Sequence, residues 1–327
     1  MSKLRLTMSC GDYDRTQPLM NGTIQPEGID LISLANTPAE TFFRMLRHNE
    51  FDMCEMSLSS YVATLFYDDP PFIAIPVFPS RFFRMSSIFV NKQAGINSPT
   101  DLIGKRVGLP EYQMTANVWI RGILSDEYGV SNDSIKYFQG GAEEPGRVEK
   151  IPLDLPPNIS LTPIDPSRTL TQMLIAGELD AVYFSIVDSE KYPQFGRLFE
   201  DFAGEELRYY KKTQIFPIMH TFVLRKDLYE KYPWVAQSMV KAFSLSKKMT
   251  YDVIDSHAAL KYMLPWLIDH IEKTRNLMGE DYWPYGLEPN RKVLETFLRY
   301  SYEQGLSKRL LKPEEIFAPA SLESFKI

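Results

Sequence analysis

The sequence lacks the features that mark secreted and membrane proteins. It has only two cysteines, Cys10 and Cys54, and no apolar run of about 18 residues, the length needed to span a membrane. The apolar part of the amino terminus covers about five residues, whereas a secretory signal needs about 7–15. We therefore expect a cytoplasmic protein with two free thiols and no membrane partner.

Metal and nucleotide motifs are also missing. The sequence contains no CxxC, no H-E-x-x-H, no G-x-G-x-x-G, no P-loop and no G-x-S-x-G. Four histidines without ligand spacing are spread along the chain: His48, His220, His257 and His270. We therefore predict no metal and no cofactor, and neither a nucleotide-binding protein nor a serine hydrolase. A metal held jointly by the distant residues Asp12, Glu55 and His220 stays open.

Strong positive charge is absent too. The net charge is −6 and no basic run occurs, which argues against nucleic acid as a partner. What the chain does have is length and aromatic content: 327 residues suffice for two domains, and 13% aromatic residues could line a pocket. We expect a small-molecule ligand. Whether the chain forms a homo-oligomer is left open.

Residues 38–61 and 167–185 follow the same plan. In each, a helix with an apolar face leads through an acidic–apolar–acidic step into a strand. The step is Glu50-Phe51-Asp52 in the first copy and Glu178-Leu179-Asp180 in the second. Two copies of a βαβ plan predict two similar α/β lobes with the ligand in a cleft between them.

Hydroxyl groups gather where the first of these strands ends. Ser57, Ser59 and Ser60 follow the predicted strand 51–56. Ligands of open α/β sheets bind outside the carboxyl ends of the strands, so this position favours a ligand site. An ordinary helix-capping cluster is the alternative.

The remaining pattern predicts how the lobes are connected. We place residues 1–86 and 221–327 in the first lobe and residues 87–220 in the second, joined by two crossing segments. Beyond Asp227 the apolar spacing predicts a helical carboxy-terminal block. Within a Gly- and Pro-rich stretch, residues 148–155 and 159–164 are predicted to form a hairpin, with a long irregular loop as the alternative.

Several stretches together resemble the 4,5-dihydroxyphthalate decarboxylase family. They are Leu6–Arg15 (LTMSCGDYDR), Gln25–Ile29, Glu40–Leu46, Glu55–Tyr61 (EMSLSSY), Pro79–Arg84 (PSRFFR) and Asp101–Leu109. The resemblance implies a fold like that of type II periplasmic binding proteins. It also implies conversion of 4,5-dihydroxyphthalate to protocatechuate and CO2 in phthalate degradation, without a cofactor. A non-catalytic binding protein for a small aromatic carboxylate is the alternative.

Such a reaction needs a cation to hold a carboxylate. Arginine pairs with carboxylates through two parallel hydrogen bonds, so Arg15, Arg81 and Arg84 are the candidates. For each of them, a structural salt bridge is the alternative.

The reaction also needs a proton donor and a base. His220, Glu55 and Asp12 are the catalytic candidates, with Asp14 beside them. A lone histidine is more often a structural residue, which is the alternative for His220. Further substrate-binding candidates are the hydroxyl-bearing residues Ser57, Ser59, Ser60, Thr115, Tyr13 and Tyr61.

Overall fold

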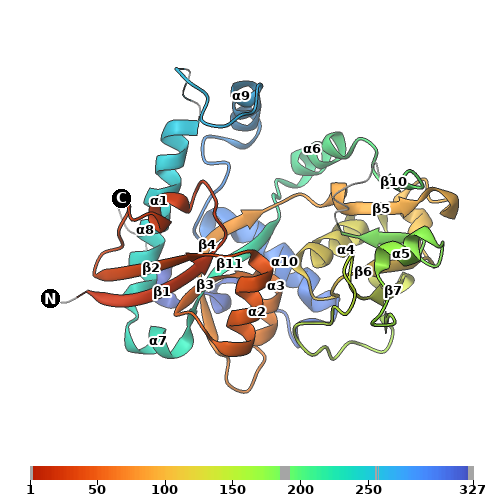
Figure 1. Cartoon of the computed structure of the whole chain (residues 1–327), viewed down its shortest axis with the longest axis horizontal. Helices are drawn as coiled ribbons and strands as arrows, with labels where there is room; N and C mark the ends of the chain where they lie inside the picture. The colour runs from red at the N-terminus through yellow and green to blue at the C-terminus, as the bar shows by residue number, and fades with distance from the viewer. Residues whose placement is uncertain (1–2, 185–191, 255, 257, 323–327) are drawn as a thin grey trace.

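The chain forms two mixed β-sheets that lie beside each other, each flanked by helices (Figure 1). The computed structural model describes residues 3–184, 192–254, 256 and 258–322. Ser185, with which the second sequence copy ends, lies outside the described residues.

The first sheet has the strand order β2-β1-β3-β11-β4. Strands β2, β1 and β3 are parallel, and β11 runs antiparallel to both β3 and β4. Its strands are β1 (Leu4–Cys10), β2 (Ile29–Ala35), β3 (Met53–Ser57), β4 (Phe72–Arg81) and β11 (Ile218–Arg225). The sheet therefore combines an amino-terminal part with one strand that returns from far along the chain.

The second sheet has the order β10-β5-β9-β6-β7-β8. Strands β9, β6, β7 and β8 are parallel, whereas β5 is antiparallel to β9 and to β10. Its strands are β5 (Ile88–Asn91), β6 (Arg106–Leu109), β7 (Lys136–Gln139), β8 (Ser160–Pro163), β9 (Ala181–Tyr183) and β10 (Phe195–Arg197).

The predicted hairpin of residues 148–155 and 159–164 is wrong. Only Ser160–Pro163 is a strand, and it pairs in parallel with β7. Residues 148–155 have no regular secondary structure, and the place beside β7 that a hairpin strand would need is taken by parallel β8. For residues 148–155 the alternative prediction, an irregular loop, is the correct one.

The sequence repeat corresponds to equivalent positions in the two sheets. Strand β3 lies between parallel β1 and antiparallel β11, and β9 lies between parallel β6 and antiparallel β5. Each is preceded by the helix that the repeat predicted: α2 (Pro38–His48) and α5 (Leu170–Ile175). The domain boundaries stay a prediction; the second one, at 220/221, falls within β11.

The helix signals in the sequence account for the ends of α2. Thr37 accepts a hydrogen bond from the Glu40 amide at the start, and Asn49 adopts a left-handed conformation with φ 48° at the end. The other helices are α1 (Gln17–Met20), α3 (Leu58–Thr64), α4 (Thr115–Tyr128), α6 (Phe202–Thr213), α7 (Lys226–Lys231), α8 (Trp234–Ile254), α9 (Leu267–Met278) and α10 (Arg291–Glu303). The region beyond Asp227 is thus largely helical, as expected.

Helix α4 connects the two halves of the molecule. Trp119 on α4 donates from its indole to the Ile218 carbonyl at the start of β11 at 2.9 Å, and its ring packs on Tyr300 of α10. At Gly122 a Cβ atom would stand 2.2 Å from the Tyr300 ring, so only glycine permits this approach of α4 and α10.

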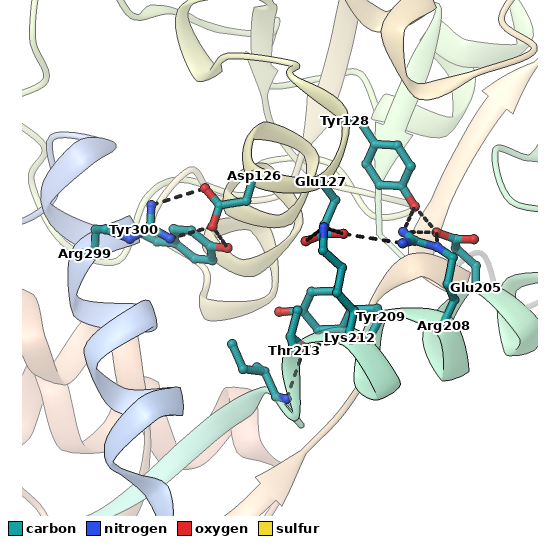
Figure 2. A network of polar contacts seen from close by, with 11 residues as sticks. Asp126, Glu127, Tyr128, Glu205, Arg208, Tyr209, Lys212, Thr213, Arg299 and Tyr300 are labelled. Atoms are coloured by element: carbon teal, nitrogen blue, oxygen red, sulfur yellow. Dashed lines mark hydrogen bonds and ion pairs between the residues drawn. The ribbon is translucent and has the colours of Figure 1, made fainter.

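The last turn of α4 lies in a network of polar contacts with α6 and α10 (Figure 2). Asp126 pairs with Arg299 at 2.5 Å and accepts from the Tyr300 hydroxyl at 2.7 Å. Glu127 pairs with Lys212 of α6 at 2.9 Å. The carboxy-terminal end of α4 is therefore fixed to two helices at once.

The sequence predicted two free thiols and no segment long enough to span a membrane. Cys10 and Cys54 are both free, as predicted, and both are buried. Across the described residues, each helix is too short or too polar to cross a membrane.

Candidate functional site

A cavity of about 350 Å³ lies between the two sheets. What we call the first wall comes from strands β3 and β11, helix α3 and the connection after β4: Ser57, Ser60, Arg84, Met219 and His220. What we call the second wall comes from the segments after β6 and β7: Glu111, Gln113, Thr115, Arg147 and Lys150. Apolar side chains, including Phe42 and Tyr183, complete the lining.

The first wall contains a histidine paired with a buried carboxylate. His220 Nδ1 lies 2.5 Å from Glu55 Oε1. The strand register explains this proximity: Glu55 of β3 is opposite Phe222 of β11, and His220 is two residues before Phe222, so its side chain is on the same face of the sheet. The pairing leaves Nε2 as the ring nitrogen for the cavity, and no hydrogen bond from the described residues reaches it.

Glu55 is fully buried and completely hydrogen-bonded. Oε2 accepts from the Gly11 amide, and Oε1 accepts from the Tyr13 hydroxyl, both at 2.9 Å. Burial by itself would raise the pKa of Glu55, but the charge and hydrogen bond of His220, together with these two donors, outweigh burial and lower it. Glu55 therefore stays ionised beside the imidazole ring.

Hydroxyl groups from both walls meet across the cavity. Ser57 Oγ and Thr115 Oγ1 are 2.8 Å apart, and Ser60 Oγ donates to Gln113 Oε1 at 2.8 Å. These predicted residues do line the cavity. Ser59 does not, and its buried hydroxyl has no hydrogen-bond partner in the described part of the chain.

The three candidate arginines have different surroundings. Arg84 lines the cavity, and burial lowers its pKa to about 10, with Glu206 opposing the shift. Arg81 is buried outside the cavity, where it donates to the carbonyls of Phe216 and Pro284 at 3.0 and 2.8 Å and to the Asn290 side chain. The structure thus brings only Arg84 to the cavity.

Arg15 also lies outside the cavity lining. Its guanidinium stacks on the Tyr13 and Trp283 rings at 4.3 and 4.5 Å, and its Nε donates to the Pro79 carbonyl at 2.6 Å. Asp14 pairs with it at 2.9 Å.

The remaining predicted residues lie behind the first wall or away from it. Tyr13 contacts Glu55 and reaches the site only through that carboxylate. Tyr61 is buried in the core, where its hydroxyl donates to the Ile316 carbonyl at 2.5 Å and accepts from the Ala74 amide. Asp12 is exposed and does not line the cavity. Their predicted roles in catalysis and binding therefore gain no support from position.

Sequence reasoning missed the charged residues of the second wall. Glu111 Oε1 accepts from Arg147 Nε at 2.8 Å and from Lys150 Nζ at 2.6 Å. Lys150 comes from the stretch 148–155 that was predicted as half of a hairpin, and Arg147 directly precedes that stretch. In the sequence, Arg147 and Lys150 stand out only as two cations close together in a Gly- and Pro-rich segment. That pattern gives no reason to place them near Glu111.

Metal ligands do not gather in the described part of the chain: no three His, Cys, Asp or Glu side chains stand close enough there to hold an ion. Glu55 and His220 are together, whereas exposed Asp12 is not with them. The absence of a metal and a cofactor stays a prediction.

Comparison with solved structures shows the fold. No known family profile matches the chain. The periplasmic sulfonate-binding protein of Methylobacillus flagellatus KT is 13% identical, with a TM-score of 0.55 over 98% of this chain and 93% of that one. The alkanesulfonate-binding protein of Xanthomonas axonopodis pv. citri is 11% identical, with a TM-score of 0.50 over 98% of both chains. The predicted type II periplasmic-binding-protein-like fold is confirmed.

Comparison of sequences identifies the family. A 4,5-dihydroxyphthalate decarboxylase of Comamonas testosteroni is 46% identical over 330 residues, covering all of both chains. A protein of the same name from Pseudomonas putida is 42% identical over 214 residues, covering 64% of this chain and 83% of the other. The predicted enzyme class, a carboxy-lyase, is thereby confirmed. The chain belongs to the 4,5-dihydroxyphthalate decarboxylase family.

Proposed function

We propose that this protein converts 4,5-dihydroxyphthalate to protocatechuate and CO2, as a step of phthalate degradation, in the cavity between the two sheets. The observation that carries the proposal is the Glu55–His220 pair on the cavity wall, in a chain similar over its full length to a decarboxylase of that substrate. A cavity of about 350 Å³ falls within the range of roughly 300–1,000 Å³ that small-molecule sites occupy.

The chemistry is replacement of a carboxylate by a proton. Protonated His220 gives its proton to the ring carbon that bears the leaving carboxylate. The bond from that carbon to the carboxylate then breaks, its electron pair returns to the ring, and CO2 departs. The hydroxyl para to the reacting carbon supplies electron density for this protonation. Solvent returns a proton to His220, so each turnover consumes one proton.

Glu55 makes His220 suited to this task. An ionised carboxylate beside the ring stabilises the imidazolium that must exist before proton transfer. Tyr13 and the Gly11 amide hold the carboxylate in position, so that Nδ1 stays engaged and Nε2 serves the substrate. Glu55 is therefore a positioning residue and His220 the proton donor.

Arg84 holds one substrate carboxylate. Its Nε contacts only Met219 Sδ, at 3.4 Å, among the described residues, so its remaining N–H groups have no competing carboxylate bound to them. Even with a pKa near 10 it is a cation at neutral pH. The hydroxyls of Ser57, Ser60 and Thr115 orient the oxygens of the substrate.

The test is CO2 release by the purified protein from 4,5-dihydroxyphthalate, with protocatechuate identified as the product. His220→Gln should lower kcat by about 10²–10⁴-fold, the range for loss of a general acid. His270→Gln is the matched control, because His270 is exposed on α9 and does not line the cavity. Binding of the substrate without CO2 release by the wild type would contradict the proposal and favour a solute-binding role.

A further inference from the structure

The second wall presents two cations that share one carboxylate. Glu111 Oε1 accepts from Arg147 and from Lys150, while Glu111 Oε2 accepts from Gln113 Nε2 at 2.7 Å. The Glu111 side chain is only 1% exposed, so the hydrogen bonds hold it in one position. With two positive charges and one negative charge, the trio leaves one positive charge at the cavity.

Both cations keep donors that the protein does not use. Arg147 binds Glu111 through Nε and Nη2, and no described residue accepts from its Nη1. Lys150 has three N–H groups, of which one binds Glu111. A nearby acid, Glu149, does not line the cavity, and its carboxylate accepts from the Tyr112 amide.

We infer that Arg147 and Lys150 form a second carboxylate subsite, opposite Arg84, which binds the carboxylate that the substrate keeps. The inference rests on the proposed function for the identity of the substrate. Phthalates carry carboxylates on neighbouring ring carbons, and these groups diverge from the ring, so cations on two facing walls match them better than one cation does. Glu111 fixes the positions of both cations before the ligand arrives, which lowers the entropy lost on binding.

The subsite predicts selectivity. A ligand with two neighbouring carboxylates uses both walls, whereas a monocarboxylate uses one. The carboxylate that leaves must lose its charge as CO2, so binding energy spent on the retained carboxylate does not oppose the reaction. Arg147 and Lys150 should therefore govern affinity for dicarboxylates more than turnover.

Direct binding of phthalate, benzoate and catechol by calorimetry tests the subsite without any turnover. In Arg147→Gln and Lys150→Gln, phthalate affinity should fall about 10–100-fold and benzoate affinity less than about threefold. Each single variant leaves one cation for buried Glu111, which keeps the fold intact. Arg168→Gln is the matched control, because Arg168 pairs with Glu178 on the surface and does not line the cavity.

Three results would overturn the inference: equal losses for phthalate and benzoate, no loss for either, or a loss confined to catechol, which would assign the wall to the ring hydroxyls. The proposed function is tested separately. A wild type that releases no CO2 but shows the phthalate-specific losses keeps the subsite and rejects the reaction. If the wild type releases CO2 but the two variants bind phthalate as tightly as the wild type does, the reaction is kept and the subsite is rejected.

Discussion

The two walls of the cavity handle charge in opposite ways. On the first wall the carboxylate of Glu55 is fully buried behind His220, with every partner coming from strand ends and the turn after β1. On the second wall the charges of Arg147 and Lys150 are partly exposed and come from a segment without regular structure. The first wall is suited to proton transfer, which needs fixed geometry. The second is suited to recognising an anion, where a single excess charge suffices.

The difference teaches that neighbouring residues of one motif can serve different purposes. Arg81 and Arg84 belong to the same short stretch, yet Arg81 ends β4 inside the protein and Arg84 lies on the first wall. Burial lowers the pKa of both to about 10. Of the two, only Arg84 has N–H groups that face the cavity and could bind a ligand.

The largest effect should come from breaking the pair on the first wall. Glu55→Gln removes the negative charge that stabilises the imidazolium of His220, so kcat should fall about 100-fold or more. Steady-state kinetics with 4,5-dihydroxyphthalate measure the loss. An unchanged kcat would mean that Glu55 only packs against His220.

Arg81→Ala should affect folding and leave recognition intact. The substitution removes donors from two carbonyls and the Asn290 side chain in the interior, so the free energy of unfolding should fall by about 3–5 kcal/mol. Urea denaturation measures this loss. A raised KM in the folded variant, with unchanged stability, would instead give Arg81 a place at the substrate.

Glu149 should make stability depend on pH. Burial raises its pKa from 4.5 to about 7, with Glu111 adding to the shift. Since the folded state holds this proton more tightly, its stabilising contribution is complete below about pH 4.5 and is lost as pH rises to about 7. The free energy of unfolding should fall by about 3 kcal/mol over that range from this group. Glu149→Gln should flatten the curve, as measured by urea denaturation at several pH values; an unchanged curve would contradict the assignment.

Arg84→Ala should weaken substrate binding by about 2 kcal/mol, which is roughly 30-fold in KM. Arg84→Lys should recover part of the loss, because lysine keeps the charge but lacks the planar fork. Stability should change little compared with Arg81→Ala, so the two alanine variants together sharpen the contrast within the motif. Equal KM values for Arg84→Ala and the wild type would remove Arg84 from the site.

The smallest expected effect is that of chelation. If the para hydroxyl supplies the electrons, CO2 release should survive exhaustive treatment with a chelator. Phthalate without ring hydroxyls should inhibit but release no CO2, because its ring cannot stabilise the charge that protonation creates. Lost activity that one divalent ion restores, or CO2 release from phthalate at a comparable rate, would each contradict this mechanism.

Local signals in the sequence predicted much of the fold. The apolar spacing in residues 38–61 and the repeated step into a strand led to α2, β3 and the matching pair in the second sheet. The hairpin failed because hydrogen bonding of β8 to β7 is a non-local choice that the intervening Gly- and Pro-rich stretch does not encode.

The site was predictable where it follows from strand ends. Glu55 and Ser57 were named because they lie at the end of a predicted strand, and His220 because it lies on a predicted crossing segment. The structure pairs these two strands. The contact of Glu111 with Arg147 and Lys150 joins residues that lie 36 and 39 positions apart in the sequence. No spacing in the sequence predicts that contact. The sequence could not show which of Arg81 and Arg84 lines the cavity, because that depends on where β4 ends.

The polar contacts at the end of α4 have a consequence for the cavity at its other end. Helix α4 spans 14 residues, about 21 Å, from Thr115 at the cavity to the ion pairs with Lys212 and Arg299. Because a helix is stiff and its far end is tied to α6 and α10, the position of Thr115 on the cavity wall is set by ion pairs at the opposite end of α4. A substitution of Lys212 or Arg299, far from the cavity, therefore acts on the cavity wall through the helix between them.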